Sequence, residues 1–553
     1  MEFYRTFDTS SDKSRDINGI LKCKNNITFL VNDKEVVNNR GLHGDLVTIR
    51  NDNVINIKKR SETLISGILH CNLNQKYGFT KKKVPYFKFT SLSGKFPSFI
   101  VPSKYKERRA IYVIIKFNKW NTTDKNPIGQ IEKIIGPVGD FNCETEALLF
   151  KNNVLTLKSN PKFQINDDVD FEVDYKTFSI DPEGCKDIDD SFHIKVLEDS
   201  SFEVGIHIAN VAYYIDIYEL TNKINYFSSI YLNDQQINML SDNLTYNYLS
   251  LGDGIKRRSL SLILTYKDNK LYSYNFRTSI VINKALSYDN ALSYDSASLL
   301  KSFTCKLLNI SDISTTKLVE HYMIIYNNLT AKTLLDKCGN TILRSQKENS
   351  STYNYGELSQ DLNEYFTRIH GVSAEYILSN REYQRHDSLN LDLYTHATSP
   401  IRRFVDIINI YNLQQKSQYF IPNEGLIESI NNFNKSLKKF YNNYNKLKFI
   451  FESESESELQ LQMDCYIVDI TTLNDIKLEV YIPTLKFTHK CIVVSSKLVK
   501  SQKIETDNNS IILNGIKLEK YKEIKVSITR LPSESRFNKK IYLKLLEPEI
   551  KLY

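Results

Sequence analysis

Short runs of alternating apolar and polar residues dominate the first 165 positions of the chain. Three such runs are Ile20–Cys23, Ile27–Val31 and Asp45–Ile49, and clusters of Asn, Asp and Gly separate them. Alternation of this kind predicts β-strands, and the polar clusters are typical of turns. Strands so short and so closely spaced favour small antiparallel barrels. We predict two of them, over residues 1–62 and 63–165.

Aromatic residues lie between lysines in the second predicted barrel. They are Tyr77, Phe79, Tyr86, Phe87, Phe89 and Phe96. Barrels of the OB class bind single-stranded nucleic acid on a basic face that carries aromatic side chains. Each of these aromatics also fits a barrel core, and the sequence leaves both interpretations open.

Longer helical patterns enter after residue 165. Residues 319–335 and 401–415 have apolar positions that recur about every 3.6 residues, and residues 431–451 form a third helical pattern. The alternating Ser and Glu of residues 452–458 predict a solvated hinge. Strand-like runs then return, at 465–470, 476–482, 511–516 and 524–528.

These patterns predict a multidomain α+β protein. Two OB-like barrels precede a central α+β domain at residues 166–455, and a third OB-like barrel follows at residues 456–553. Because strands dominate both ends of the chain and helices its middle, neither an all-α nor an all-β fold describes it.

Charge and cysteine usage narrow the setting of the protein. The net charge is +8 and the pI about 8.7, which fits a polyanionic partner without establishing one. The eight cysteines form no CxxC pair, which favours reduced thiols inside a cell. The first residues lack the apolar core of a signal peptide, and no run of 18 apolar residues predicts a membrane span. We therefore expect an intracellular, cytoplasmic protein without a membrane partner.

The strongest local signal for chemistry is a cluster of four aspartates. Asp181, Asp187, Asp189 and Asp190 fall within ten residues, between apolar flanks. Carboxylates this dense repel each other unless they are solvated or share cations, and oxygen-only ligands select Mg²⁺ or Mn²⁺. An acidic surface turn is the alternative. A Ca²⁺ loop does not fit, because its D-x-D-x-D-G spacing is absent.

A second signal surrounds two adjacent arginines. Ser399-Pro400 fits a helix start, with Ser399 as the N-cap, and this start would place Arg402 in the first turn. A helix N-terminus attracts phosphate, and Arg suits bidentate contacts to it. The alternative is an ordinary capped helix with a surface pair of arginines.

Taken together, these two segments closely resemble the paired signatures of the RNB family, the ribonuclease II and ribonuclease R type. Residues 394–406 are similar to the family's Tyr-Thr-His-Phe-Thr-Ser-Pro-Ile-Arg-Arg-Tyr-x-Asp. Residues 204–211 resemble its Val-Gly-Val-His-Ile-Ala-Asp-Val strand, and residues 40–47 and 128–146 resemble barrels of the eukaryotic exosome-subunit branch. The resemblance runs from about residue 15 to residue 450, and more loosely to the end.

The resemblance implies a role for each matched residue. Asp181 and Asp190 would be direct ligands of a catalytic Mg²⁺, with Mn²⁺ as an alternative, and Asp187 would support the same site. Loss of Asp189 should stop cleavage while sparing RNA binding, and Arg402 would steady the scissile phosphate. The residues that would contact RNA are Tyr231, Tyr288, Glu320 and Arg403. Of these, the tyrosines would stack on bases near the 3′ end, and Glu320 would lie near the sugar, where a 2′-OH contact distinguishes RNA from DNA.

The implied activity is hydrolysis of single-stranded RNA from its 3′ end, processively, to nucleoside 5′-monophosphates. The family resemblance favours a monomer, and exosome membership is not assumed, since we expect no preceding endonuclease domain. An RNB-fold protein that binds RNA without cutting it is the first alternative. A metal-dependent DNA exonuclease is the second.

Several positions depart from the family pattern. Asn210 replaces an Asp, Ala397 replaces a Phe, and residues 386–390 lack two glycines. The stretch from 291 to 317 is also short. The resemblance implies a narrow channel that leads RNA to the active site. The departures concern the shape of that channel, the product length and processivity, and they spare the four aspartates and Arg402.

Overall fold

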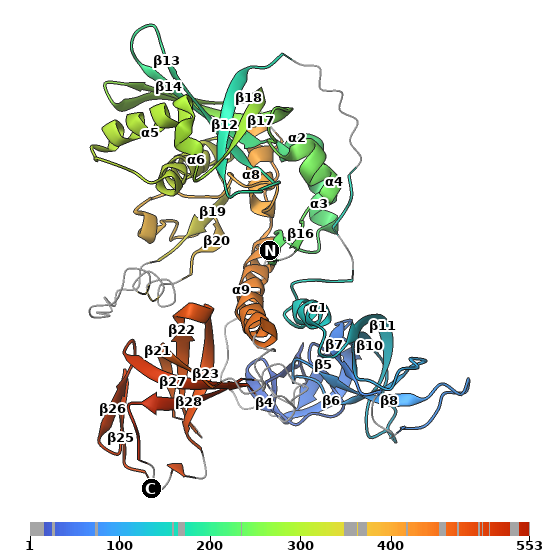
Figure 1. Cartoon of the computed structure of the whole chain (residues 1–553). Helices are drawn as coiled ribbons and strands as arrows, with labels where there is room; N and C mark the ends of the chain where they lie inside the picture. Colours follow the sequence, from blue (N-terminus) through green and yellow to red (C-terminus); the bar gives the residue numbers. More distant parts are fainter. Residues whose placement is uncertain are drawn as a thin grey trace. The chain divides into compact units, whose positions relative to one another are not determined.

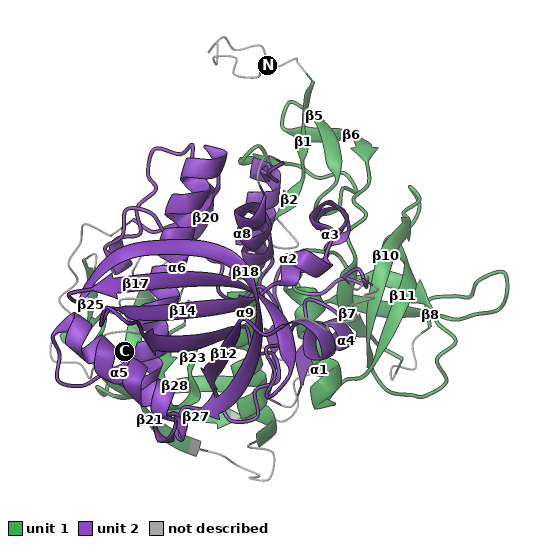
Figure 2. Cartoon of the chain, turned by 90° about the horizontal axis from the view of Figure 1, so that it is seen from above, with its two compact units in different colours: residues 1–154, 436–553 green, residues 155–435 purple. Residues whose placement is uncertain are grey.

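A computed structural model describes residues 16–551, with gaps at 25–27, 72–75, 158–159, 164–171, 234, 348–361, 363–365, 367–372, 416–417, 453–459, 473–474, 496–497, 500–501, 508 and 531–540. The chain forms two compact units (Figures 1 and 2). Unit 1 comprises Met1–Val154 and Ser436–Tyr553, and unit 2 comprises Leu155–Lys435. The predicted hinge at 452–458 lies, apart from Glu452, outside the described residues.

The N-terminal part of unit 1 consists of short strands followed by a closed barrel. The first strands are β1 (Ile17–Ile20), β2 (Lys22–Cys23), β3 (Phe29–Val31), β4 (Lys34–Val36), β5 (Leu46–Arg50) and β6 (Asn53–Lys59). They pair as two three-stranded sheets, β1-β5-β6 and β2-β3-β4, around a small apolar core. The expected run Ile20–Cys23 is therefore two strands. They divide at buried Leu21, whose amide donates to the Asp45 carbonyl.

The second predicted barrel is closed. Its strands are β7 (Ile65–Leu69), β8 (Tyr86–Ser91), β9 (Phe99–Pro102), β10 (Ile111–Lys119) and β11 (Ile128–Pro137). Helix α1 (Phe141–Lys151) follows them and begins at Asp140, whose carboxylate accepts the Cys143 amide. Phe87, Phe89 and Phe96 are buried in the core of this barrel, whereas Phe79 is exposed. The aromatic residues of this barrel are thus divided between packing and surface.

Unit 2 is built on a second closed barrel. Its strands are β12 (Tyr175–Asp181), β13 (Asp190–Val196), β14 (Phe202–Ala209), β17 (Lys256–Lys267) and β18 (Lys270–Ser287). β12 lies parallel to β18, and the other pairs are antiparallel. Phe178, Phe192, Ile206 and Leu262 point to one side and pack with the helices. The alternate positions are polar and buried, and Ser191, His207 and Ser261 are examples.

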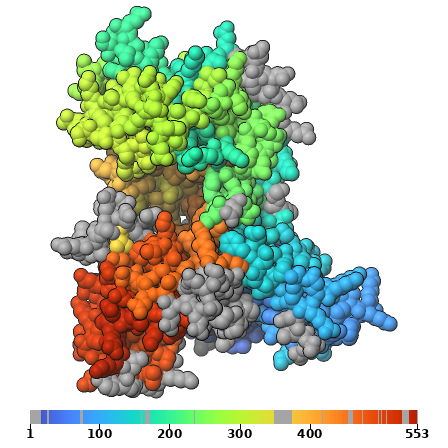
Figure 3. Space-filling view, viewed as in Figure 1, coloured from blue at the N-terminus to red at the C-terminus, as the bar shows by residue number. Residues whose placement is uncertain are grey.

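Helices cover the apolar side of this barrel. They are α5 (Asp295–Leu308), α6 (Thr315–Cys338) and α8 (Phe404–Gln414), which contribute Phe303, Tyr322 and Ile410 to the same core. The outward side of α5 lies on the surface of unit 2, in the yellow-green part of the space-filling view (Figure 3). α9 (Glu424–Glu452) follows. No helix within the described ranges is long and apolar enough to cross a membrane.

Smaller elements complete unit 2. They are α2 (Val211–Tyr214), α3 (Ile217–Lys223), β15 (Ile230–Tyr231), β16 (Gln236–Ile237), α4 (Asp242–Leu244), η1 (Thr245–Leu249), η2 (Ala291–Ser293), β19 (Ile342–Ser345), β20 (Glu375–Leu378) and η3 (Asp387–Leu389). The helical patterns predicted at 319–335, 401–415 and 431–451 correspond to α6, α8 and α9, so helical periodicity identified all three.

Strands return at the C-terminal end of unit 1. They are β21 (Gln460–Thr471), β22 (Ile476–Ile482), β23 (Phe487–Val494), β24 (Ile504–Thr506), β25 (Ser510–Leu513), β26 (Ile516–Glu519), β27 (Glu523–Arg530) and β28 (Ile541–Glu547), with η5 (Pro483–Leu485) between β22 and β23. Five of them form a sheet in the order β23-β22-β21-β27-β28. The run expected at 511–516 is wrong as a single strand, because Asn514 and Gly515 adopt positive φ and form a hairpin turn.

The predicted fold class, multidomain α+β with strand-rich ends around a mixed centre, is confirmed. The exact domain limits stay predictions. Two of them fall at or beside residues outside the described ranges, near 165 and 455.

Candidate active site

The aspartate loop, Asp181–Asp190, connects the end of β12 to the start of β13. Its first residues turn sharply: the Cys185 amide donates to the Pro182 carbonyl, and Gly184 has a φ of +78°. The returning part is anchored at Ile188, whose amide donates to Ser250 Oγ at 3.0 Å and whose side chain is buried. Because one end of the loop is fixed in each of two neighbouring strands, its carboxylates are held together.

The arginine segment, Tyr394–Arg403, precedes α8. The predicted helix start at Ser399 is wrong, because α8 begins at Phe404. Arg403 has an extended backbone and forms a bridge with Ser228, and the Ser399 carbonyl accepts the Arg403 amide in a turn. Tertiary pairing has therefore overridden the local capping signal, and Arg402 lies in a turn rather than in the first turn of a helix.

Asp189 joins these two segments. Its Oδ1 accepts the Ile401 amide at 2.9 Å, and its Oδ2 accepts from Arg402 Nε at 3.3 Å. Its side chain is 3% exposed, and burial raises the pKa of this carboxyl to about 7. The other described bond of Arg402 runs from Nη2 to Ser399 Oγ at 3.1 Å. Asp189 thus fixes the direction of Arg402.

Asp187 is held by a different set of residues. Its Oδ2 accepts from Tyr231 Oη at 2.6 Å and from Gln236 Nε2 at 2.9 Å, and the Cys185 thiol lies 3.8 Å from Oδ1. Burial and the hydrogen bond to Asp187 raise the pKa of the Tyr231 hydroxyl. The hydroxyl therefore stays protonated and donates a hydrogen bond to the carboxylate. The strand pair β15–β16, which carries Tyr231 and Gln236, therefore positions Asp187.

Asp181 and Asp190 carry the least compensated charge of the loop. Asp181 Oδ2 is buried and has no hydrogen-bond partner among the described residues. Burial raises the pKa of Asp181 to about 6, with Asp187 adding to the shift, and raises that of Asp190 well above its usual range, with Asp181 adding to it. A bound cation would favour the ionised form of both carboxylates and lower these raised pKa values.

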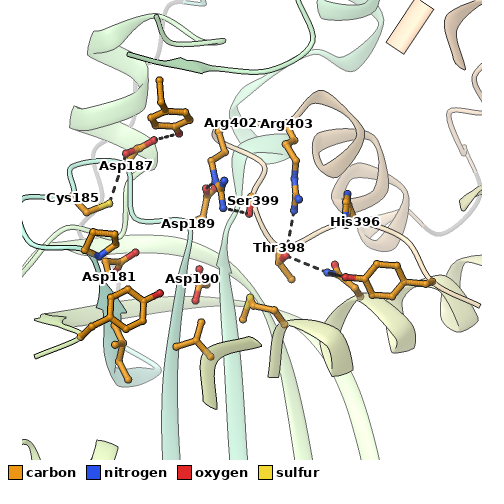
Figure 4. A pocket seen from close by; sticks show the side chains of 18 residues that line it. Asp181, Cys185, Asp187, Asp189, Asp190, His396, Thr398, Ser399, Arg402 and Arg403 are labelled. Carbon is orange, nitrogen blue, oxygen red and sulfur yellow. Dashed lines mark hydrogen bonds and ion pairs between the residues drawn. The ribbon is translucent and has the colours of Figure 1, made fainter. Parts of the chain in front are cut away.

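These residues surround one cavity of about 520 Å³, shown in Figure 4. It is lined by Ile180, Asp181, Pro182, Cys185, Asp187, Asp189, Asp190, Tyr231, Tyr288, Val319, Met323, Asn327, Tyr394, His396, Thr398, Ser399, Arg402 and Arg403. Eight of the nine site residues predicted from the sequence are therefore brought together. The ninth, Glu320, does not line the cavity, and its carboxylate pairs with Lys317 at 2.7 Å.

The Arg403 side chain is less exposed than that of Arg402, at 25% against 47%. Its Nη2 donates to Asp406 Oδ1 at 2.8 Å and contacts Thr398 Oγ1 at 3.4 Å, and the Asp406 side chain is fully buried. Only part of the Arg403 guanidinium faces the cavity. Its contact with RNA remains a prediction.

The sequence interpretation did not single out four other polar residues of the lining, Asn327, Tyr394, His396 and Thr398. Three of them lie inside the quoted motif, and Asn327 follows Val319 and Met323 at four-residue spacing along α6. A polar residue on the buried stripe of a helix is the signal that could have identified Asn327.

The donor set fits a hard divalent cation. All three acidic ligand candidates, Asp181, Asp187 and Asp190, offer oxygen, and the buried Asp181 Oδ2 lacks a partner among the described residues. No three His, Cys, Asp or Glu side chains within the described ranges converge closely enough to hold an ion by themselves. Mg²⁺ ordinarily keeps several waters and takes substrate phosphates as ligands, so one or two protein carboxylates are enough to hold it.

Comparisons with known proteins agree with this geometry. Residues 170–298 and 301–418 match the model of the RNB domain, and residues 81–153 match that of the Dis3-like cold-shock domain 2. The chain therefore contains an RNB domain, and a Dis3-like cold-shock domain precedes it. The resemblance inferred from the two motifs is confirmed.

Two curated relatives show which proteins it is similar to. Exosome complex exonuclease RRP44 homolog A from Arabidopsis thaliana is 31% identical over 224 residues, 36% of this chain and 24% of that protein. Ribonuclease R 2 from Lactococcus lactis is 23% identical over 387 residues, 54% of this chain and 58% of that protein. The chain thus matches less than two thirds of the length of either relative.

Two solved structures share the fold over nearly the whole chain. RNase R of Mycoplasma genitalium, in complex with ribose-methylated single-stranded RNA, has a TM-score of 0.71 at 15% identity and covers 96% of this chain and 100% of its own. Yeast Ssd1, a pseudonuclease, has a TM-score of 0.65 at 14% identity and covers 98% of each chain. At such identities the likeness concerns the fold alone.

Proposed function

We propose that this protein is a hydrolytic 3′-to-5′ exoribonuclease that degrades single-stranded RNA processively to nucleoside 5′-monophosphates. One observation carries the proposal: the aspartate loop and the arginine segment face one cavity, and Asp189 bonds directly to both Ile401 and Arg402. The RNB-domain relatives named as exonucleases and ribonucleases support the choice of substrate.

In this proposal Asp181 and Asp190 hold Mg²⁺, with Mn²⁺ as the alternative, and Asp187 supports them. When bound, the metal would polarise the scissile phosphate and lower the pKa of an attacking water. The chain itself contributes the orientation of the carboxylates. Tyr231 and Gln236 both donate to Asp187 Oδ2, and these two bonds fix the orientation of its carboxylate.

Arg402 would contact the scissile phosphate. Its Nε is committed to Asp189 and its Nη2 to Ser399, and the side chain is 47% exposed. The remaining N–H groups can donate to a phosphate oxygen as negative charge builds up on it. Asp189 is then a positioning residue for Arg402, and this is why its loss should stop cleavage.

The terminal nucleoside would lie against an apolar wall. Tyr288, Val319 and Met323 are packed together at the edge of the barrel core and also line the cavity. A base placed there would stack on Tyr288, and Tyr231, which is 40% exposed, would meet the next one. Contacts of Arg403 with the RNA backbone and of Glu320 with the sugar are further parts of the proposal.

The reaction balances simply. A water oxygen bonds to the phosphorus of the last phosphodiester, the bond from phosphorus to the O3′ of the preceding nucleotide breaks, and the proton lost by the water ends on that O3′. A 5′-monophosphate leaves. The proposed partner is single-stranded RNA bound by a monomer, and exosome association is not part of the proposal.

The test uses the full chain with a 5′-labelled single-stranded RNA and Mg²⁺, and the products are run on a sequencing gel. We expect the RNA to shorten from its 3′ end to a stub of a few nucleotides. An Asp189→Asn variant should bind the RNA and cut it at least about 100-fold more slowly, since Arg402 loses its anchor. An all-deoxy strand of the same sequence is the control and should stay intact.

Other outcomes select the alternatives. If the protein binds RNA and cuts nothing with either Mg²⁺ or Mn²⁺, it is an RNA-binding protein of the RNB fold. If the all-deoxy strand is degraded equally well, it is a DNA exonuclease.

A further inference from the structure

Asn327 lies where α6 contacts the arginine segment. Its side chain lines the cavity, yet the residue is only 2% exposed. A buried amide must satisfy one acceptor and two donors, so its partners reveal what it does.

All three capacities are used within the protein. Asn327 Oδ1 accepts the Ala397 amide at 2.8 Å. Its Nδ2 donates to Tyr394 Oη at 3.1 Å and to Thr398 Oγ1 at 3.4 Å. Because a backbone amide can only donate, the Ala397 contact fixes which way the side-chain amide points. Both N–H groups are therefore committed within the protein, and Asn327 has no donor left for a substrate phosphate.

The contact with Thr398 continues toward the arginines. Thr398 Oγ1 also accepts from Arg403 Nη2 (Figure 4). Arg403 Nη2 donates to Asp406 Oδ1 as well, and the same oxygen accepts the Ser399 amide. Ser399 Oγ in turn accepts from Arg402. A chain of polar contacts therefore runs from α6 to both arginines.

We propose that Asn327 is a positioning residue that holds the arginine segment in the geometry that Arg402 needs for cleavage. The inference rests on the proposed exoribonuclease function. It goes beyond that function by assigning a role to a residue outside both sequence signatures.

The same helix also forms the apolar wall of the cavity. Val319, Met323 and Asn327 are spaced by four residues, so they share one face of α6. A shift of α6 would move the wall and the arginine segment together. The position of Asn327 therefore affects the rate of the chemical step more than the binding of the RNA that trails outside the cavity.

Asn327→Leu keeps the shape of the side chain and removes its polar atoms. We expect the single-turnover cleavage rate to fall by roughly 10- to 100-fold, as small displacements of a catalytic group do. The affinity for RNA should stay within about threefold, because phosphate contacts elsewhere dominate it. Hydrogen exchange at the Ala397 amide should become faster.

Asn328→Leu is the matched control. Asn328 is the next residue of α6, and its Nδ2 donates to the Leu393 carbonyl at 2.6 Å, just before the arginine segment. The control should change the cleavage rate and the Ala397 exchange much less than Asn327→Leu. Tyr394→Phe removes a single partner of Asn327 and serves if Asn327→Leu fails to fold. It should reduce the cleavage rate about fivefold, near the value of one hydrogen bond.

Three results would overturn the proposal: a normal cleavage rate in Asn327→Leu, an equal fall in Asn328→Leu, or a parallel loss of RNA affinity. If the wild-type protein cuts no RNA, the proposed function fails, and the exchange experiment still decides the matter. Unchanged exchange at Ala397 would then refute the positioning role.

Discussion

The aspartate loop and the arginine segment meet at one cavity, but they are held in opposite ways. The arginine segment is fixed by buried hydrogen bonds: Asp406 and Asn327 accept from the amides of Ser399 and Ala397, and Asn409 donates to the His396 carbonyl. In the aspartate loop, Asp181 has a buried oxygen without a described partner, and burial raises the pKa of its carboxyl.

The arginine segment is thus preorganised by hydrogen bonds, whereas the aspartate loop holds buried carboxylates whose charge is not compensated within the protein. The arginine segment contributes to the stability of the fold through these buried hydrogen bonds, although Arg403 Nε is buried without a partner among the described residues. The aspartate loop costs stability until a cation and a phosphate complete it, as is common for functional sites. Removing a buried carboxylate of the aspartate loop should therefore raise stability, and breaking a buried bond that holds the arginine segment should lower it, while both changes reduce activity.

The largest effect is expected for Asp181→Asn. Cleavage of single-stranded RNA should fall by more than about 100-fold, because a carboxylate facing the cavity is lost. The apparent Tm in EDTA at pH 8 should rise, since the neutral amide avoids burying a charge whose cost is on the order of 2 kcal/mol. Gel assays and thermal unfolding measure the two effects. The control is Asp268→Asn, the same change at an exposed hairpin turn, and a fall in the Tm of Asp181→Asn would contradict the comparison.

Arg402→Lys should have the next largest effect. A guanidinium can donate to Asp189 and to a phosphate at the same time, and the lysine ammonium lacks this forked geometry. Cleavage should therefore fall by roughly 100-fold. The Tm should barely move, because the Arg402 side chain is 47% exposed. Single-turnover kinetics beside unfolding curves would test this. A large loss of Tm would mean that Arg402 is structural.

Asp406→Asn should reduce stability strongly. Asp406 is fully buried and pairs with Arg403 Nη2 at 2.8 Å, so its loss leaves a mostly buried guanidinium uncompensated, at a cost of about 2–3 kcal/mol. Chemical denaturation gives the measurement. Glu320→Gln breaks the exposed pair with Lys317 and should cost less than about 0.5 kcal/mol. Equal losses in the two variants would show that burial is not the deciding factor.

Local patterns predicted much of the fold from the sequence. Helix α6 and strands β5 and β22 were found because apolar periodicity is a property of neighbouring residues. The helix start at Ser399 failed because its alternative involves Ser228, whose backbone pairs with Arg403 from a distant part of the chain. Capping propensity is weak against such tertiary pairing.

The site shows the same limit more sharply. The four aspartates form a visible cluster in the sequence. The bond from Arg402 to one of them, Asp189, however, joins residues 213 positions apart. Only the resemblance to a known family put the two segments together. Asn327 was missed because its partners lie about 70 residues away, and a single asparagine in a helix carries no local signal for them.

The smallest effect, and the one that contrasts the two sides most directly, concerns pH. Burial and the charges of Arg403 and Arg344 hold the pKa of His396 well below its usual range, so the folded state keeps this imidazole neutral. Below about pH 6.5 the unfolded chain takes up the proton, and stability falls; at pH 5.5 one such histidine costs about 1.4 kcal/mol. Asp181 has the opposite sign. Its raised pKa, about 6, means that stability is full below pH 4 and is lost as the pH rises through 6.

Thermal unfolding between pH 4 and pH 8 in EDTA should therefore separate the two sides. His396→Gln should flatten the acid limb of the Tm profile only in part, because burial also lowers the pKa values of His193 and His207. Asp181→Asn should make the fall in Tm between pH 6 and pH 4 steeper, because it removes a group that gains stability as the pH drops. If His396→Gln left the acid limb as steep as in the wild type, the arginine segment would not be the acid-sensitive side, because the proton would then bind elsewhere in the unfolding reaction.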